Sequence, residues 1–365
     1  MLGTERLSDR TFELGPIRPP SEGGSHSLLL RTTRNCSWNR CRFCYGLIYG
    51  REKFELRSVE EIKKDIDTVK YIADAIRSMS WQLGYGGAIN EAVATALVRQ
   101  DPALNSSHCF VLVFNWLAVG AKTAFLQDAN SMIMRTSDML EVLRYLKETF
   151  PTLERITSYA RSKTLDKKSL EDLKAIHDAG LTRLHVGLET GDDELLVFVD
   201  KGVTAEEHIR GGRKAKEAGF ELSEYVMPGL GGRERSEQHA LNTARVLNQI
   251  NPDFIRLRPF VTGMGSPIYE DYKKGVFDLT SPHERLRELR TFVENLDVTS
   301  RLCFDHFLNG WYRDRARRIL LFRQDYEGYK LPEEKAEVLQ LIEEGLRIDE
   351  SEHINVKDLI GLSSL

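Results

Sequence analysis

The sequence lacks a large excess of charge and has no long apolar run. It contains 51 Lys and Arg residues and 55 Asp and Glu residues, a formal net charge of −4. This balance gives no reason to expect nucleic acid or an anionic membrane as a partner. The longest apolar stretch, 109–120, is interrupted by Asn115 and is too short to span a bilayer. The first ten residues lack the apolar core of a secretory signal. These absences predict a cytoplasmic protein.

Cysteine is also scarce, and its distribution is uneven. Three of the five cysteines fall within nine residues, in the run Cys36-Ser-Trp-Asn-Arg-Cys41-Arg-Phe-Cys44. An odd number with three clustered favours a reducing compartment over a disulfide framework. Three cysteines cannot make two disulfides, and loops this short would strain even one.

The clustered thiols therefore indicate a metal or cluster site. A tetrahedral zinc site would need a fourth ligand, and no fourth Cys or close His follows the run. Three thiolates with one position left open suit a [4Fe–4S] cluster whose fourth iron binds something other than protein. The pattern favours the cluster, with structural zinc or packing cysteines as the alternative. Cys109 lies in an apolar run and is expected to be buried packing.

The rest of the chain predicts an α/β protein. Short apolar strands alternate with amphipathic helices, an order typical of parallel βα units. Residues 1–25 are rich in Pro and Gly and are expected to form a leader. Residues 78–120 are expected to be a helical insertion, and residues 278–365 a helical, strand-poor extension. The expected strands are 27–32, 123–126, 155–159, 183–187, 221–226 and 254–257, and the expected helices start at 57 and span 137–150, 169–179, 204–218 and 237–250.

Polar groups lie near the end of each expected strand or directly after it. In parallel barrels the active site lies at the C-terminal ends of the strands, because the loops converge there. A lone Asp or Glu after a strand is also a common helix N-cap, so each position taken alone has a structural alternative. The polar groups are the cysteine run, Asp128 with Asn130, Tyr159 with Arg161, Glu189, Glu224 with Gly229, and Arg256 with Arg258.

The cysteine run resembles that of the radical S-adenosylmethionine (SAM) superfamily. Its C-x4-C-x2-C spacing has one residue more than the usual C-x3-C-x2-C, and Phe43 matches the aromatic before the last cysteine. Other runs resemble a mostly uncharacterised branch of that superfamily, formerly labelled Fe–S oxidoreductases. These runs are FLQDANS, RITSYARSKT, GLTRLHVGLETGDDE, YVMPGLGG and NPDFIRLRP. Their order behind the cysteines makes the combined pattern specific.

The resemblance implies a fold, cofactors and a reaction. The fold would be a partial (β/α)6 TIM-type barrel over residues 26–277. The cofactors would be SAM and a [4Fe–4S] cluster held by Cys36, Cys41 and Cys44. In this family an electron from the cluster cleaves SAM to a 5′-deoxyadenosyl radical, which abstracts hydrogen from the substrate. The electron donor would be a protein such as flavodoxin or ferredoxin. The substrate would be an unidentified small organic molecule, and the arginines after the strands would suit an acidic one.

The resemblance also assigns roles to individual residues. Arg161 would pair with the SAM carboxylate, and Glu189 would contact the ribose or the amino group. Asp128 and Asn130 are assigned by position alone, because this chain lacks the family's glycines there. The expected cofactor contacts are Phe43, Asp128, Asn130, Tyr159, Arg161, Glu189, Glu224 and Gly229.

Asp305 and His306 are expected to be catalytic, since the branch carries an Asp–His pair near its end. In a helical extension, adjacent residues cannot share one helix face, so one of the two would point into the barrel mouth. A His there could pass a proton, and an Asp could orient a polar substrate. The alternative is that both anchor the extension to the barrel.

A second function also stays open, that of a haem- or metal-handling protein that keeps the cluster without radical catalysis. Production of 5′-deoxyadenosine from SAM and a reductant would distinguish the two functions.

Overall fold

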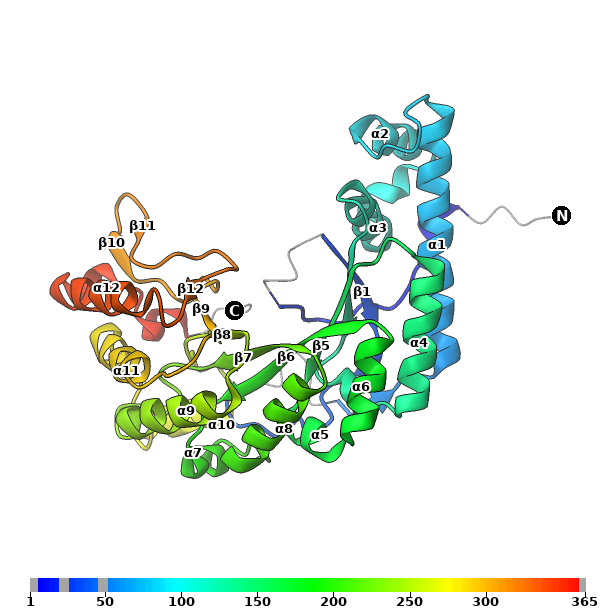
Figure 1. The fold of residues 1–365 in the computed structure, drawn as a ribbon. Coiled ribbons are helices and arrows are strands. Elements are labelled where there is room, and N and C mark those ends of the chain that lie inside the picture. The colour runs from blue at the N-terminus through cyan, green and yellow to red at the C-terminus, as the bar shows by residue number, and fades with distance from the viewer. Residues whose placement is uncertain (1–5, 20–25, 45–51, 361–365) are drawn as a thin grey trace. The chain divides into compact units, whose positions relative to one another are not determined.

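The computed structural model describes residues 6–19, 26–44 and 52–360, and it divides into two compact units (Figure 1). Unit 1 comprises residues 1–36, 53–159 and 175–183, and unit 2 comprises residues 37–52, 160–174 and 184–365. Three elements have residues in both units: α6 (Leu170–Asp178), β6 (Leu181–Glu189) and β5 (Arg155–Ala160), of which only Ala160 belongs to unit 2. Parts of the predicted leader, 1–5 and 20–25, lie outside the described residues. Its described part carries a single 3-10 turn, η1 (Leu7–Asp9).

Unit 1 contains three parallel strands. They are β1 (Ser27–Arg31), β4 (Thr123–Gln127) and β5 (Arg155–Ala160), in the order β1-β4-β5. Leu29 pairs with Phe125, which pairs with Thr157, and all three side chains are buried. Two short strands, β2 (Thr33–Arg34) and β3 (Glu55–Leu56), pair antiparallel after β1.

The first three α-helices of unit 1 begin at side-chain caps. The first, α1 (Val59–Gln82), is capped by Ser58, whose Oγ accepts the Glu61 N–H at 3.2 Å while the Glu61 carboxylate accepts the Ser58 N–H at 2.8 Å. Helices α2 (Glu91–Gln100) and α3 (His108–Ala118) pack against α1 (Figure 1), so the predicted insertion is mostly helical. The last helix that lies wholly in this unit is α4 (Thr136–Thr149).

Unit 2 continues the alternation of strands and helices. Its strands follow the order β6-β7-β8-β9-β12, with β7–β8 and β8–β9 parallel and β12 antiparallel to β9. Their bounds are β7 (Glu221–Val226), β8 (Phe254–Leu257), β9 (Arg301–Cys303) and β12 (Tyr329–Lys330), beside a separate hairpin of β10 (Tyr312–Asp314) and β11 (Ile319–Leu320). The helices are α5 (Ser162–Lys167), α7 (Asp193–Phe198), α8 (Ala205–Glu217), α9 (Ser236–Ile250), α10 (Pro267–Lys273), α11 (Pro282–Glu294) and α12 (Lys335–Arg347).

The predicted α/β class with parallel strands is confirmed, and the C-terminal extension differs in one respect. It contains the expected helices α11 and α12, but β9 also adds a parallel strand, in which Leu302 pairs with Ile255. Three residues are too few to give the alternation by which strands are recognised in a sequence. Asp305 and His306 follow β9 in an irregular segment, so the expectation that they lie on a helix is wrong. Among the described helices, none combines the length and apolar content needed to cross a bilayer.

Candidate functional site

The second and third cysteines of the run lie on an apolar floor. The Cys44 N–H donates to the Cys41 carbonyl at 3.2 Å, which closes a turn around Phe43. Phe43 is 9% exposed and belongs to a buried cluster with residues such as Leu195 and Phe260, and Cys41 and Cys44 pack against this cluster. None of the five cysteines, all within the described ranges, forms a disulfide.

The residues on both sides of Cys41 are held by a turn that we call the docking turn, residues 198–202. The Trp38 indole N–H donates to the Asp200 carbonyl at 2.6 Å, and the Arg42 N–H donates to the Val199 carbonyl at 2.8 Å. Gly202 has a φ of +68°, and a Cβ there would lie 2.3 Å from Trp38. Only glycine therefore fits below the indole, and the longer loop between Cys36 and Cys41 is fixed by this contact.

The same turn places a lysine beside the cysteines. Lys201 Nζ lies 2.9 Å from Glu189 Oε1 and 5.5 Å from the centroid of the Phe43 ring. Burial opposes the charge of Lys201, but the Glu189 carboxylate and the Cys41 thiolate outweigh it and raise the lysine pKa. Sequence reasoning missed Lys201, because a lone lysine before a glycine carries no recognised signal.

Glu189 ends β6 with a φ of +66°, a left-handed conformation that is uncommon outside glycine. A Cβ at Gly187 would lie 2.3 Å from Glu189 Oε1 and 3.1 Å from Lys201 Nζ. The missing side chain at Gly187 is what makes room for the Glu189–Lys201 pair.

Arg161 is bonded to the docking turn. Its Nη2 donates to the Lys201 carbonyl at 2.6 Å, and its guanidinium carbon lies 5.1 Å from the Trp38 ring centroid. Arg161 thus supports both the turn and the cysteine loop. Its predicted pairing with the SAM carboxylate stays a prediction.

Among the predicted cofactor contacts of this unit, Glu224 is the one whose carboxyl group is buried without a partner among the described residues. It is 0% exposed, and neither carboxyl oxygen has a hydrogen-bond partner among the described residues. Burial raises the pKa of Glu224 well above its usual value, repulsion from Glu189 adds to this, and Lys201 opposes it. Gly229, predicted beside it, has a φ of +85°, and its N–H donates to Glu288 Oε1 at 2.7 Å.

Asp305 is paired within the chain. Its Oδ2 accepts from Arg256 Nη1 at 2.6 Å, and the two side chains are 3% and 1% exposed. Arg256 also donates to Ser223 Oγ at 3.1 Å and to the Tyr326 carbonyl at 3.2 Å. Burial raises the Asp305 pKa, and the Arg256 charge opposes this. Burial also raises the pKa of the nearby Cys303 thiol to about 12.

His306 is a neutral side chain. Burial, with the nearby Arg258 charge, lowers its pKa to about 3. Its Nδ1 accepts the Leu308 N–H at 3.3 Å, so the neutral ring carries its proton on Nε2. This geometry offers a hydrogen-bond donor and makes proton uptake near pH 7 unfavourable.

The predicted residues of unit 1 support the backbone before the first cysteine. Asp128 is fully buried, and its Oδ2 accepts from Arg31 Nη2 at 2.7 Å and from the Asn35 N–H at 3.2 Å. Burial raises the Asp128 pKa, and Arg31 opposes this. Asp128 thus fixes the residue directly before Cys36.

Other side chains of unit 1 are also engaged. Asn130 is buried, and Tyr159 packs edge-on against Phe125 with ring centroids 5.1 Å apart. Arg34 pairs with three carboxylates, those of Glu13, Glu55 and Glu61. Arg34 and Arg256 therefore both have carboxylate partners inside the chain, which weakens the case for an acidic substrate.

The cysteines fit a cluster in their donor chemistry. Within the described residues, no three His, Cys, Asp or Glu side chains converge where a single metal ion could sit. A [4Fe–4S] cluster binds its thiolates through different irons, so its cysteines do not have to meet at one point.

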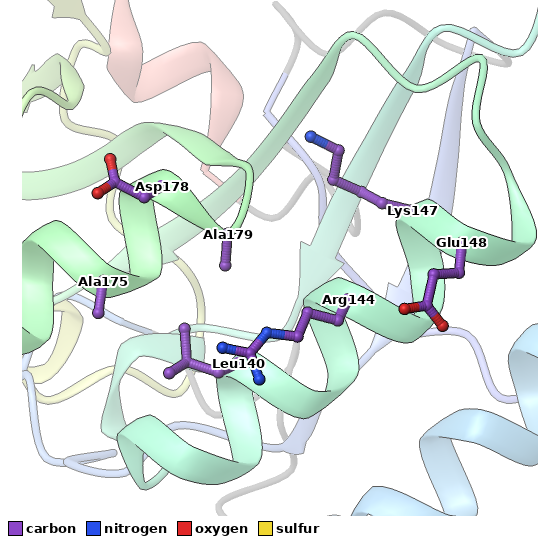
Figure 2. Close-up of a pocket in the computed structure, with 7 residues that line it drawn as sticks. All are labelled: Leu140, Arg144, Lys147, Glu148, Ala175, Asp178 and Ala179. Atoms are coloured by element: carbon purple, nitrogen blue, oxygen red, sulfur yellow. The ribbon is translucent and has the colours of Figure 1, made fainter.

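A surface groove of unit 1 lies apart from these residues. It occupies about 470 Å³ between α4 and residues 175–179 (Figure 2). Its lining consists of Leu140, Arg144, Lys147, Glu148, Ala175, Asp178 and Ala179. None of the residues predicted from the sequence lines it, so this groove is not the predicted site.

Residues 120–244 match the family model of the radical SAM superfamily. This chain carries a radical SAM domain. Proteins of this superfamily are enzymes that use a [4Fe–4S] cluster and SAM, so the predicted family, enzyme class and cofactors are confirmed. The matched stretch begins after the cysteine run, and the roles of individual residues stay predictions.

Curated relatives match parts of this chain. It is 28% identical over 99 residues to tRNA uridine(34) acetyltransferase of Methanocaldococcus jannaschii, which covers 27% of this chain and 18% of the relative. It is 25% identical over 155 residues to mouse Elongator complex protein 3, covering 41% and 27%. It is 26% identical over 129 residues to the heme chaperone HemW of Bacillus subtilis, covering 35% and 34%. The chain thus spans about a third or less of each relative's length.

Solved structures give similar partial matches. Methylornithine synthase (PylB) aligns with a TM-score of 0.44 at 14% identity, over 90% of this chain and 72% of that one. Coproporphyrinogen III oxidase (HemN) of Escherichia coli also aligns with a TM-score of 0.44 at 14% identity, over 73% and 51%. The curated relatives include a protein named for tRNA, so the expectation that nucleic acid is excluded as a partner is not supported.

Proposed function

We propose that this chain is a radical SAM enzyme that binds a [4Fe–4S] cluster through Cys36, Cys41 and Cys44 and abstracts hydrogen from an organic substrate. The observation that carries the proposal is the cysteine loop, which rests on the docking turn with Cys41 and Cys44 against the apolar floor. When bound, the cluster and SAM supply the electron transfer and the radical precursor.

The chain's own residues stabilise charge at this site and keep water away from it. Phe43 and the cluster around it keep water from one side of Cys41 and Cys44. In that low-dielectric setting the Lys201 ammonium offsets the negative charge of the Cys41 thiolate. Glu189 holds Lys201 in place through their 2.9 Å contact.

The proposed substrate is a small organic molecule, and a tRNA base is kept as a second class because two relatives are named for tRNA or the Elongator complex. An electron carrier such as flavodoxin or ferredoxin would deliver the electron. The cysteines form no disulfide in the described ranges, which supports a reducing, cytoplasmic location.

Anaerobic reconstitution with iron and sulfide tests the proposal. The wild type should bind iron, absorb near ~400 nm and release 5′-deoxyadenosine from SAM and dithionite. Replacing Cys36, Cys41 and Cys44 with Ala should abolish all three properties. Cys109→Ala is the matched control, since Cys109 is buried in α3 and its thiol lies 3.4 Å from the Phe12 carbonyl. Retained iron in the triple variant would refute the assignment.

The second function, haem or metal handling without radical catalysis, is supported by the match to a protein named as a heme chaperone. The same assay separates it from the first. A wild type that binds the cluster and haem but forms no 5′-deoxyadenosine above the triple variant's level would favour this function.

A further inference from the structure

Two carboxyl groups of unit 2 have opposite surroundings. Glu189, at the end of β6, is ion-paired with Lys201 at 2.9 Å. Glu224, in β7, is fully buried and has no hydrogen-bond partner on either oxygen among the described residues. The charged groups that act on Glu224 are Glu189, which repels its anion, and Lys201, which already has a carboxylate partner.

These surroundings decide the protonation state of Glu224. A buried carboxylate without a cation or N–H donor costs far more than the protonated acid, so such a group takes up a proton. A protonated carboxyl group is suited to donate a hydrogen bond, and a carboxylate held in an ion pair is suited to accept one. Glu224 then offers an O–H, and nothing in the described chain receives it.

We propose that Glu224 keeps its proton in the folded protein and donates it as a hydrogen bond to SAM, while the Glu189 carboxylate, paired with Lys201, offers only acceptors. The ligand atom facing Glu224 is therefore an acceptor, such as a hydroxyl oxygen, a carboxylate oxygen or a ring nitrogen. This inference rests on the proposed function for its ligand, and it adds the protonation state and direction of the bond.

The protonation of Glu224 can be tested without SAM. In the unfolded chain Glu224 ionises above about pH 4.5, so retaining its proton in the folded state costs more as the pH rises toward the folded-state pKa. Glu224→Gln mimics the protonated acid and removes this cost. Its melting temperature should exceed that of the wild type by more at pH 8 than at pH 6. Glu217→Gln, at an exposed position ending α8, is the control and should show no such trend. A pH-independent difference for Glu224→Gln would overturn the proposal.

The direction of the bond is tested with SAM itself, by equilibrium binding to the reconstituted full chain. Glu224→Gln keeps an N–H donor and should bind SAM within about threefold of the wild type. Glu224→Leu has similar volume and no donor, and should bind about tenfold more weakly, the scale of one unsatisfied acceptor. Equal losses of SAM affinity in both variants would show that a carboxylate is required and would overturn the proposal. Unchanged SAM affinity in Glu224→Leu would show that Glu224 does not contact SAM. A wild type that binds no SAM would refute the proposed function, while the melting series would still decide whether Glu224 is protonated.

Discussion

Two regions of unit 2 differ in how their polar groups are satisfied. Around the cysteine loop, Trp38, Arg42 and Arg161 are bonded to backbone carbonyls of the docking turn, so these side chains act as a scaffold beside Cys41. After β9, Asp305 is itself used as scaffold, because Arg256 binds it in a buried pair. Both regions carry residues that the sequence marks as functional. The comparison shows that a predicted functional residue is a weaker candidate for ligand binding when its polar atoms already have partners within the chain.

The largest effect is expected from breaking the Asp305–Arg256 pair. Asp305→Ala should lower the free energy of unfolding by ~3–5 kcal/mol, because Arg256 would be left buried without its counter-charge. Anaerobic guanidinium unfolding measures this. The double variant Arg256→Met with Asp305→Leu should lose less than Asp305→Ala alone. A stable Asp305→Ala variant that loses only substrate turnover would return Asp305 to a catalytic role.

The next largest effect is expected at Glu189, which lies in the region around the cysteine loop. Glu189→Ala should weaken SAM binding by ~1.5–3 kcal/mol, the scale for hydrogen bonds to charged groups, with the iron content unchanged. Arg161→Ala should lower the iron content as well, since its Nη2 holds the docking turn. Calorimetry and iron analysis on the same preparations measure both. Unaltered SAM affinity in both variants would show that the strand-end alignment is wrong.

A smaller effect is expected from Trp38, which tests the scaffold of the loop. Trp38→Phe removes the 2.6 Å bond to Asp200 and keeps most of the ring, at a cost of ~1 kcal/mol. The variant should lose iron faster than the wild type during anaerobic dialysis against a chelator, and its cluster spectrum should broaden. Trp81→Phe is the control, since Trp81 is 67% exposed. Equal iron loss in the two variants would argue against the docking turn.

The smallest effect is expected at His306. Its pKa of about 3 lies below the ordinary value, so the folded state resists protonation and loses stability as the pH falls through 6.5 toward 3. His306→Gln cannot titrate, and its melting temperature should fall less than that of the wild type between pH 7.5 and pH 5. Parallel melting curves would mean that His306 titrates normally in the folded protein.

Much of the fold could be predicted from the sequence because its signals are local. The strand positions follow from short apolar runs, and Ser58 with Glu61 marks the start of α1 by a capping box that the structure contains. The three-residue β9 could not be predicted, since it becomes a strand only by pairing with β8. Its absence from the prediction led directly to the wrong helical setting for Asp305 and His306.

The site could be predicted only in part, because some of its residues act through distant partners. The cysteines and Glu189 lie in recognisable motifs, but Lys201 acts through Glu189, which lies 12 positions away. Gly202 acts through Trp38, which lies in another loop. The state of Glu224 depends on which groups are missing around it. Absent partners leave no pattern in a sequence, so they emerge only from the folded structure.

The contact between Trp38 and Gly202 links two features that a sequence comparison would treat separately. The indole fits because position 202 has no side chain, and Trp38 is one of the four residues between the first two cysteines. Loop length and the glycine would then have to change together during evolution. Chains that have both the longer cysteine spacing and the glycine should share this loop architecture. Deleting Asn39, which would restore the C-x3-C-x2-C spacing, should therefore displace Trp38 from Gly202.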